Sequence, residues 1–331
     1  MKNLKKYSII DLHLHLDGSL SAKAIIEVAK EENIKLPTFN EEELNTYLRV
    51  PKDCKSLNEY LERFDIPNLV LQTKNGIHKC TYDLLKRLDE QGLKYVEIRM
   101  APQLSTQKEL SQEDVVKELI NVKKEAENKL SIKVNYILCM MRIPNNKEKN
   151  LETVELAKKY KDKGVVAVDL AGAEALFGNK DFEEELKLVK KYGLNLTVHS
   201  GEATDFHEVD LALSYGANRI GHGVHSIESK NTVEKLKNLC KPLEICPTSN
   251  IDTKSYKSYE ELPIRKLFDA GVIVTINTDD MSVSNTTLIE EFEIVEKLGF
   301  SEQEIKQLTL NAIEAAFISS KEKEQLKAFI K

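Results

Sequence analysis

Short runs of apolar, often β-branched residues recur along the chain, and longer stretches with apolar residues three or four positions apart separate them. The short runs predict strands, and the longer stretches predict amphipathic helices. The predicted strands are Ser8–Leu14, Tyr95–Arg99, Lys133–Cys139, Val165–Leu170, Asn195–His199, Arg219–Gly221, Leu243–Ile245 and Val272–Asn277. Eight strands that alternate with helices predict an α/β fold, a closed (β/α)8 barrel of the TIM type.

Glycine follows several of the predicted helices. The amphipathic stretch Glu183–Lys191 leads to Gly193, and Ile264–Ala270 leads to Gly271 and then into the last predicted strand. Glycine is favoured just past a helix end. A doubly wound open sheet would show the same alternation, but no G-x-G-x-x-G follows any predicted strand, so the barrel is preferred.

The segment between the first two predicted strands is unusually long. Ser19–Gly92 has helical periodicity but no convincing strand, and it is expected to form additional helices over the C-terminal mouth of the barrel. No Gly/Ser linker, low-complexity tract or repeat divides the chain. Residues 1–331 are therefore expected to form a single domain.

Charge and composition narrow the possible partners and compartments. The formal net charge of −6 provides no positive field for a phosphate backbone, so nucleic acid is not an expected partner. The five cysteines are odd in number and form no C-x-x-C pair, which fits reduced thiols in the cytoplasm. The N-terminus lacks a signal-peptide core, and no run approaches the ~18 apolar residues of a membrane helix. A cytoplasmic protein without membrane insertion is expected.

Two histidines lie close together near the end of the first predicted strand. In extended chain, His13 and His15 project to one side, while Leu12 and Leu14 project to the other. Two imidazoles on one face provide half of a metal site. Taken alone, His-x-His is more often an ordinary pair of surface or loop histidines.

Further candidate ligands follow other predicted strands. His199 and His222 lie at the ends of the fifth and sixth strands, and Asp279 and Asp280 follow the eighth. The carboxyl ends of barrel strands surround one cleft, so these side chains are expected to converge there. Singly, each has a plainer interpretation: a strand-end histidine is often a hydrogen-bonded core residue, and an aspartate pair often caps a helix.

Imidazoles together with one carboxylate favour zinc over calcium or magnesium, which prefer oxygen ligands. Two-metal barrel hydrolases commonly carry a bridging lysine on the fourth strand, and Val165–Leu170 contains none, so one Zn²⁺ per chain is expected. The H-E-x-x-H of metalloproteases and the P-C-x-x-C of cytidine-type deaminases are both absent.

Five segments carry a resemblance to a known family. In chain order, they read His13-Leu-His-Leu-Asp-Gly-Ser19, Asp169-Leu-Ala-Gly172, His199-Ser-Gly-Glu202, Arg219-Ile-Gly-His-Gly223 and Asn277-Thr-Asp-Asp280. With these motifs the chain resembles, nearly end to end, the adenosine deaminases of the metal-dependent amidohydrolase superfamily. Ser200 and Met281 stand where many members have alanine and proline, and neither position carries chemistry.

The resemblance implies a role for each site residue. His13, His15, His199 and Asp279 would hold the zinc, and His222 would orient the attacking water and help to deprotonate it. Glu202 would protonate N1 of the purine, Asp280 would contact N7, the backbone N–H of Gly172 would reach N3, and Asp17 would bind the ribose. Neighbouring residues in extended chain point in opposite directions, which fits Asp279 facing the metal and Asp280 facing the base.

The implied reaction is the hydrolytic deamination of a small purine nucleoside. Zinc lowers the pKa of a bound water to about 7 and so allows attack at C6 near neutral pH. Attack is easier when N1 is protonated, which requires a carboxylic acid that keeps its proton near neutrality. A raised pKa is therefore expected for Glu202.

A stripe in the long N-terminal segment is similar to the apolar lid helix of the family. Leu57, Tyr60, Leu61 and Phe64 share one face at helical spacing. Such a stripe is as often ordinary core packing as a substrate gate, so both interpretations stay open.

Two rival functions are open. The first is deamination of free adenine or of a modified adenosine. Asp17 argues against free adenine, because adenine deaminases tend to have glutamate at this place. The second is a catalytically silent metal-binding or signalling barrel, which usually lacks a ligand or the acid. His207 and His225 are interpreted as structural or supporting residues, and His78 has no assigned role.

Overall fold

The computed structural model describes residues 4–330 and contains all eight predicted strands. They are β1 (Ile10–His15), β2 (Tyr95–Met100), β3 (Lys133–Arg142), β4 (Val165–Gly172), β5 (Thr197–Ser200), β6 (Arg219–His222), β7 (Leu243–Ile245) and β8 (Val274–Ile276). The strands β3 and β4 run further than predicted, to Arg142 and Gly172. Their extra residues reach the rim of the barrel, where they take part in the site.

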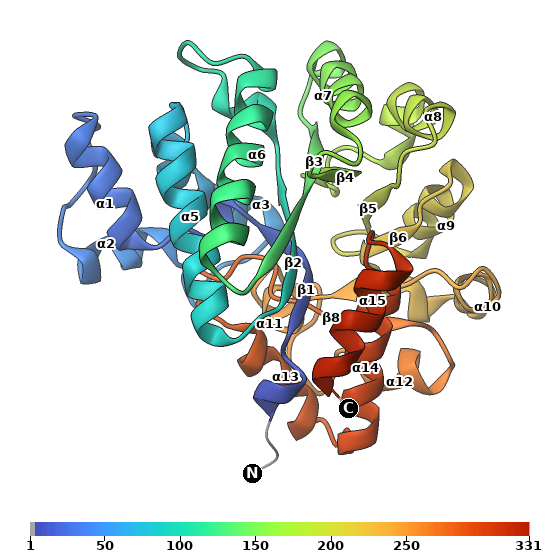
Figure 1. Cartoon of the computed structure of the whole chain (residues 1–331). Helices are drawn as coiled ribbons and strands as arrows, with labels where there is room; N and C mark the ends of the chain where they lie inside the picture. The colour runs from blue at the N-terminus through green and yellow to red at the C-terminus, as the bar shows by residue number, and fades with distance from the viewer. Residues whose placement is uncertain (1–3, 331) are drawn as a thin grey trace.

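The strands close into a barrel (Figure 1). Within the described residues, β1 to β4 and β5 to β8 each form a four-stranded parallel sheet in chain order. Parallel bridges join the two sheets at both seams, between Val168 and Leu196 and between Leu14 and Asp279. At the second seam the N–H of Asp279 donates to the carbonyl of His13 at 2.8 Å. The predicted (β/α)8 architecture is confirmed.

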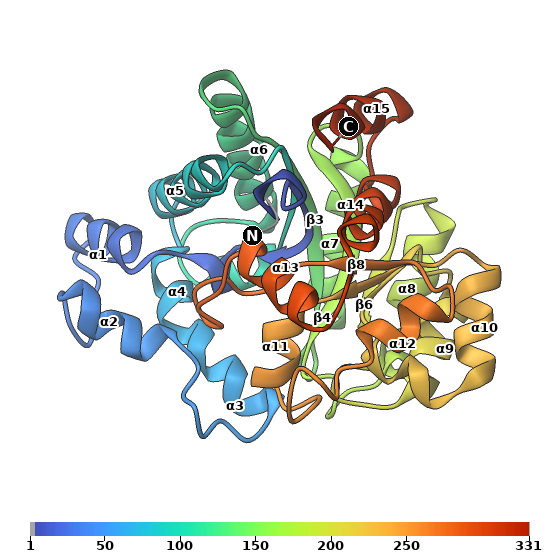
Figure 2. The same cartoon turned by 90° about the horizontal axis from the view of Figure 1, so that it is seen from below.

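Helices surround the barrel (Figures 1 and 2), as the alternating sequence pattern predicts. After β2 they are α6 (Gln112–Lys129), α7 (Lys147–Tyr160), α8 (Glu183–Lys191), α9 (Phe206–Tyr215), α10 (Lys230–Asn238), α11 (Pro247–Asp252), α12 (Ile264–Asp269), α13 (Leu288–Lys297), α14 (Glu302–Ala315) and α15 (Ser320–Lys327). Short 3₁₀ turns cover Leu4–Lys6, Asp17–Ser19, Glu62–Phe64, Pro102–Ser105, Asn179–Phe182, Val224–Glu228 and Ala328–Ile330.

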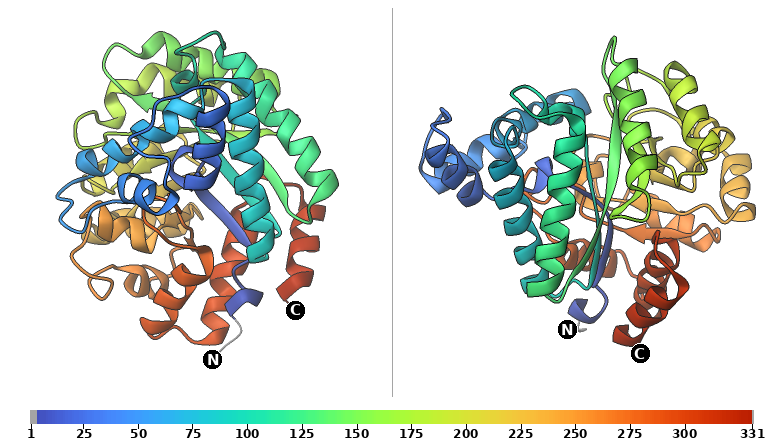
Figure 3. Two further views of the ribbon diagram at one scale, coloured as in Figure 1. Left: turned by 90° about the vertical axis from the view of Figure 1, so that its left-hand side faces the viewer. Right: turned by 45° about the horizontal axis from the view of Figure 1, so that its top comes forward.

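The long segment after β1 forms helices joined by loops and contains no strand, as expected. It contains α1 (Ala22–Glu31), α2 (Glu41–Leu48), α3 (Leu57–Leu61), α4 (Asp65–Val70) and α5 (Lys74–Gln91). Helix α5 lies beside α6 on the barrel wall, and α1 packs against its outer side (Figure 3). Residues of α3, the turn Glu62–Phe64 and α4 line the cavity at the barrel mouth. The additional helices thus divide between the mouth and the outer wall.

We propose that the chain is a single domain, because one cluster of buried apolar side chains extends from Leu4 to Ile330. A small separate cluster lies under α3 and contains Cys54, Leu57, Tyr60 and Val283. No helix in the described part of the chain is both long and apolar enough to cross a bilayer.

Candidate active site

The predicted strand-end residues meet at the C-terminal mouth of the barrel. The Nε2 atom of His199 lies 3.1 Å from Nε2 of His13 and 3.2 Å from Nε2 of His15. Oδ1 of Asp279 lies 3.2 Å from His13 Nε2 and 3.3 Å from His15 Nε2. Three imidazole nitrogens and one carboxylate oxygen therefore point at a common centre.

His222 belongs to the same cluster. Its Nε2 lies 3.8 Å from Oδ2 of Asp279 and 3.5 Å from Oε2 of Glu202. The candidate ligand atoms of His13, His199, His222 and Asp279 all lie within 4.8 Å of one another. The geometry alone thus offers His15 and His222 as alternative fourth members, and the family resemblance assigns His15 to the metal.

Two of these residues have left-handed backbones. His222 has φ 57° and Asp279 has φ 64°, which is uncommon for residues other than glycine and typical of strained functional positions. The sequence predicted that the side chains of Asp279 and Asp280 diverge because the chain is extended at these residues. This reason was wrong, because the backbone of Asp279 is left-handed. Their side chains do diverge, but the left-handed turn at Asp279 produces the divergence.

Buried carboxylates orient two of the imidazoles. His13 Nδ1 lies 2.8 Å from Oε2 of Glu244, and His199 Nδ1 lies 3.0 Å from Oδ2 of Asp169. Because each carboxylate accepts the Nδ1 proton, Nε2 keeps the lone pair that a metal requires. These nitrogen and carboxylate donors fit one borderline transition ion such as zinc.

These carboxylates continue into a buried ion network inside the barrel. Arg99 on β2 donates to Asp169 Oδ2 at 2.9 Å and to Glu244 Oε2 at 2.7 Å. Arg219 on β6 donates to Glu244 and, at 2.6 Å, to Oε2 of Glu97. This network was not predicted from the sequence. Charged residues within otherwise apolar predicted strands were the available signal, because such residues must be paired when buried.

Glu202 lies 3 % exposed beside His222. Burial raises the pKa of Glu202 to about 8, with smaller contributions from the nearby carboxylates of Asp279 and Glu174. Its Oε1 has no hydrogen-bond partner among residues 4–330. The structure thus agrees with the expectation of an acid that keeps its proton near neutral pH and faces open space.

Asp280 presents a second free carboxyl oxygen. Its Oδ2 accepts a hydrogen bond from the Tyr60 hydroxyl at 3.0 Å, whereas its Oδ1 has no partner in the described chain. Burial, and then the adjacent Asp279 carboxylate, raise the pKa of Asp280 well above its usual range. A buried polar atom without a partner usually marks a place where a ligand binds.

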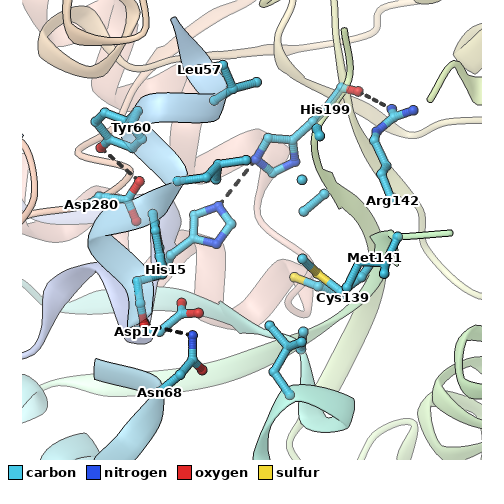
Figure 4. A pocket seen from close by; sticks show the side chains of 18 of the residues that line it. His15, Asp17, Leu57, Tyr60, Asn68, Cys139, Met141, Arg142, His199 and Asp280 are labelled. Carbon is cyan, nitrogen blue, oxygen red and sulfur yellow. Dashed lines mark hydrogen bonds between the residues drawn. The ribbon is translucent and has the colours of Figure 1, made fainter. Parts of the chain in front are cut away.

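A cavity of about 570 Å³ opens beside the cluster (Figure 4). Its polar wall includes His15, Asp17, His199, Glu202, His222, Asp279 and Asp280. Gly172 lies on the rim of this wall with φ 105°, a conformation that favours glycine. The apolar part of the lining includes Ala101, Leu104, Cys139, Met141 and Ala171. A flat, partly apolar ligand with several polar edge atoms fits such a lining.

The stripe on α3 and the following turn lies between the cavity and the small apolar cluster. Leu57, Tyr60, Leu61 and Phe64 all line the cavity, and all four also belong to, or pack against, the small cluster under α3. Figure 4 shows Leu57 and Tyr60 on one side of the cavity. The residues are therefore both wall and local core, and their action as a gate stays a prediction.

The remaining histidines lie outside the cavity lining. His207 pairs with Asp205 at 2.9 Å, His225 with Glu228 at 2.8 Å, and His78 with Glu118 at 2.8 Å. His225 also stacks on Tyr256. These contacts agree with structural roles.

The short helix α11 contributes partners that sequence analysis missed. The Ser249 hydroxyl donates to Asp279 Oδ2 at 2.7 Å, and the Asn250 amide lies 3.0 Å from His222 Nδ1. No periodicity or motif marks such a contact, because its partners lie on other strands. Only the barrel geometry brings them together.

A cluster of imidazoles and a carboxylate at the C-terminal mouth of a (β/α)8 barrel defines a metal-dependent hydrolase of the amidohydrolase type. The family model for adenosine deaminase matches residues 9–331, and the chain belongs to that family. An adenosine deaminase of Haemophilus ducreyi is 46% identical over 332 residues, which cover 99% of this chain and 96% of the relative.

Two solved structures share the fold nearly end to end. An adenine deaminase from Arthrobacter aurescens has a TM-score of 0.89 at 25% identity and covers 97% of each chain. An Arabidopsis N6-mAMP deaminase has a TM-score of 0.87 at 28% identity and covers 100% of this chain and 99% of its own. The same barrel therefore occurs in deaminases named for different purine substrates.

Proposed function

We infer that this chain is an adenosine deaminase, which hydrolyses adenosine and 2′-deoxyadenosine to inosine and 2′-deoxyinosine with release of ammonia. One observation carries the inference: two buried carboxyl groups with raised pKa values, Glu202 and Asp280, each present a free oxygen beside the imidazole cluster. Protonated carboxyls donate hydrogen bonds, and N1 and N7 of adenine accept them. The family membership supports the same substrate.

We propose that one zinc ion binds per chain, held by His13, His15, His199 and Asp279. The support is their convergent Nε2 and Oδ1 atoms, together with the carboxylates that orient His13 and His199. When bound, zinc would lower the pKa of a water molecule and so supply a nucleophile near neutral pH.

The residues of the chain would then perform the proton transfers. Glu202 gives its proton to N1, which makes C6 electrophilic toward water. His222, whose Nε2 faces Glu202, takes the proton that the attacking water loses. His222 then gives its proton to the amino group, the C6–N bond breaks, and ammonia leaves. The proton on N1 stays in the product, and the C6 hydroxyl returns a proton to Glu202 as C6=O forms.

Substrate orientation is assigned to three further groups. Asp280 donates to N7, the N–H of Gly172 donates to N3, and Asp17 binds the ribose. Burial raises the pKa of Asp17 to about 6, so it remains largely ionised at pH 7 and accepts hydrogen bonds from sugar hydroxyls. A ribose contact favours adenosine over free adenine, the substrate named for the Arthrobacter relative. Leu57, Tyr60, Leu61 and Phe64 are proposed to cover the bound nucleoside.

We also propose a cytoplasmic location. Among the described residues all five cysteines are free thiols, and four of them are buried, which suits a reducing compartment.

The substitution Glu202→Gln tests the assignment of the acid. Glutamine keeps the shape but cannot give the proton to N1, so kcat for adenosine is expected to fall by about 10³ or more, with the metal content unchanged. The assay is the loss of adenosine absorbance, run in parallel with 2′-deoxyadenosine and adenine. Glu228→Gln, on the exposed surface, is the matched control. Near-normal turnover by Glu202→Gln would refute the role, and turnover of adenine alone would move the substrate assignment to the free base.

A further inference from the structure

A buried carboxylate next to the site has no role in the reaction described above. Glu174 follows β4 and is 1 % exposed. It accepts backbone hydrogen bonds from Gly201 at 2.6 Å, Glu202 at 3.1 Å and Ala203 at 2.9 Å, and one from the Thr204 hydroxyl at 2.6 Å. All four donors belong to the segment 201–204, which carries the proposed acid.

We propose that Glu174 is a positioning residue that sets the distance between the acid Glu202 and the Gly172 N–H, and so aligns N1 and N3 of the purine. The proposal rests on the roles given to Glu202 and Gly172 in the proposed function. It adds a specific requirement: a carboxylate at position 174, with both oxygens engaged.

The backbone explains why the requirement is for a carboxylate. Three successive N–H groups point to one side where Gly201 takes φ 66°, and such a concave row of amides favours an anion. A carboxylate has about four acceptor sites on two oxygens, which is enough for these four donors. Glutamine has only one acceptor oxygen and would turn its NH2 group toward N–H donors.

Glu174 also lies close to Gly172, the proposed N3 donor. The Glu174 N–H donates to the carbonyl of Gly172 at 2.8 Å, so one tight turn joins the carboxylate to the proposed N3 donor. Gly172 ends β4, which fixes it to the barrel wall. The side chain of Glu174 therefore ties the segment 201–204 to a rigid strand end.

Arg142 ties the loop after β4 to strand β5, which leads into segment 201–204. Its guanidinium donates to the carbonyl of His199 at 2.7 Å (Figure 4) and to the carbonyl of Phe177, beyond Glu174 in the loop after β4, at 2.6 Å. With these contacts, the loop after β4 is fixed at both ends while Glu174 reaches across to the segment 201–204.

The distance between Glu202 and the Gly172 N–H matters because both groups contact the same ring of the purine. N1 and N3 flank C2 on one edge of the six-membered ring, so a donor at each atom defines how the ring lies against the attacking water. A displacement of a catalytic group by about 1 Å commonly costs about 10² in rate. Loss of the Glu174 contacts is therefore expected to lower kcat while leaving ground-state binding nearly intact.

The experiment compares Glu174→Gln, Thr204→Val and Thr204→Ser in the metal-loaded enzyme. For Glu174→Gln we expect kcat for adenosine to fall by about 10- to 1000-fold, with KM within about threefold of the parent. The Ki of 1-deazaadenosine, which has no N1 to meet Glu202, should stay within about twofold. Thr204→Val removes one of the four donors and should lower kcat about three- to tenfold, and Thr204→Ser should restore it.

Controls separate positioning from general damage. Glu208→Gln alters another carboxylate, which accepts the Asn179 N–H after β4. Within residues 4–330 no described hydrogen bond joins the Glu208 side chain to segment 201–204, so this variant should keep kcat. Two results for Glu174→Gln would overturn the proposal. One is a fall in kcat and metal content together with a similar rise in KM and in the Ki of 1-deazaadenosine. The other is a folded variant with parental kcat. If Glu174→Gln does not fold, parental kcat in Thr204→Val overturns it.

Glu202→Gln is measured alongside these variants. If Glu202→Gln is inactive and Glu174→Gln is normal, only the positioning role fails. If Glu202→Gln is active, the proposed acid is wrong, and the positioning role falls with it.

Discussion

Gly18 leaves the space that Asp280 occupies. A Cβ atom at position 18 would lie 1.7 Å from Asp280 Oδ1, the free oxygen assigned to N7. The structure therefore explains the glycine of the His-Leu-Asp-Gly motif by a close side-chain approach, since none of the described positive-φ glycines is Gly18. At the scale of single residues, the absent side chain of Gly18 leaves the Asp280 carboxyl free to bind the substrate.

Gly18→Ala is expected to displace the Asp280 carboxyl. We expect kcat/KM for adenosine to fall by about 10², with the metal retained, because the metal cluster does not include Asp280. Gly193→Ala is the control: its Cβ would meet nothing within 4 Å, although φ is 60°. That variant should lose only about 1 kcal/mol of stability. Full activity in Gly18→Ala would show that Asp280 can move without consequence.

Asp279→Ala removes the one carboxylate of the metal cluster. We expect metal content after dialysis to fall to about a tenth of the parental value or less, since each ligand and its support strongly affects affinity. Metal analysis of the purified variant measures this directly. Stoichiometric metal in Asp279→Ala would mean that another group, such as Glu202, completes the site.

The sequence predicted the inward-facing site residues more fully than their supporting contacts. His13, His15, His199, His222, Asp279 and Asp280 could be found because each stands at a recognisable strand end. Glu174, Ser249 and Asn250 could not, because their roles depend on which loops the barrel brings together. The left-handed backbone of Asp279 could not be predicted either, since no sequence pattern indicates it.

At the scale of elements, α13 holds the site helix α11 in place. Glu291 on α13 is fully buried and accepts the N–H of Thr248, in the first turn of α11, at 3.0 Å. It also accepts a hydrogen bond from the Thr286 hydroxyl, in the loop after β8. Through Glu291, α13 fixes the position of Ser249 and Asn250.

Glu291 also makes stability depend on pH. Burial raises its pKa from 4.5 to about 7. The folded state therefore keeps a proton that the unfolded state loses above pH 4.5, so this contribution is fully present below that pH and is lost as pH rises through about 7. The loss amounts to a few kcal/mol at most, on the order of 1.4 kcal/mol per pKa unit.

Glu291→Gln should remove this dependence. Urea unfolding of both proteins at pH 5, 6, 7 and 8 is expected to show the parent losing stability relative to the variant between pH 5 and 7, with little further change above pH 7. Parallel stability curves for the two proteins would mean that Glu291 does not titrate in this range.

Helix and strand positions were accessible from the sequence because each is a local pattern. Glu183–Lys191 was predicted to be helical and forms α8 with the same bounds. The bounds of β1 and β8 differ from the prediction by one or two residues, because pairing partners decide where a strand ends. Whether α3 moves when substrate enters is not a local property, and its sequence is compatible with both interpretations.

At the scale of the whole molecule, the proposed metal ligands come from β1, β5 and the end of β8. A metal that binds only this assembled arrangement stabilises the folded state by mass action. Removal of the metal with a chelator is expected to lower Tm by at least about 5 °C, and added zinc should restore it. Differential scanning calorimetry, with metal analysis of each sample, measures the change. An unchanged Tm after verified metal loss would show that the buried ion network alone holds the barrel mouth together.

The barrel itself could be predicted because alternation along the chain is a whole-molecule signal. The network of Glu97, Arg99, Asp169, Arg219 and Glu244 could not, because it depends on how strands are arranged around the barrel. It places charge where a sequence pattern leads one to expect apolar packing. Its members orient His13 and His199, so the departure from an apolar interior serves the site.

The closing seam of the barrel has a consequence for how the protein is made. Asp279 donates its N–H to the His13 carbonyl, and its own carbonyl accepts the N–H of His15, so the first and last strands join at the proposed metal ligands. A ribosome adds Asp279 to the growing chain long after His13 and His15. A growing chain can therefore present the imidazoles of His13 and His15 early but cannot complete the proposed ligand set until Asp279 has emerged. The full proposed ligand set therefore cannot bind a metal before Asp279 has been made, and a chain that stops before this residue lacks it.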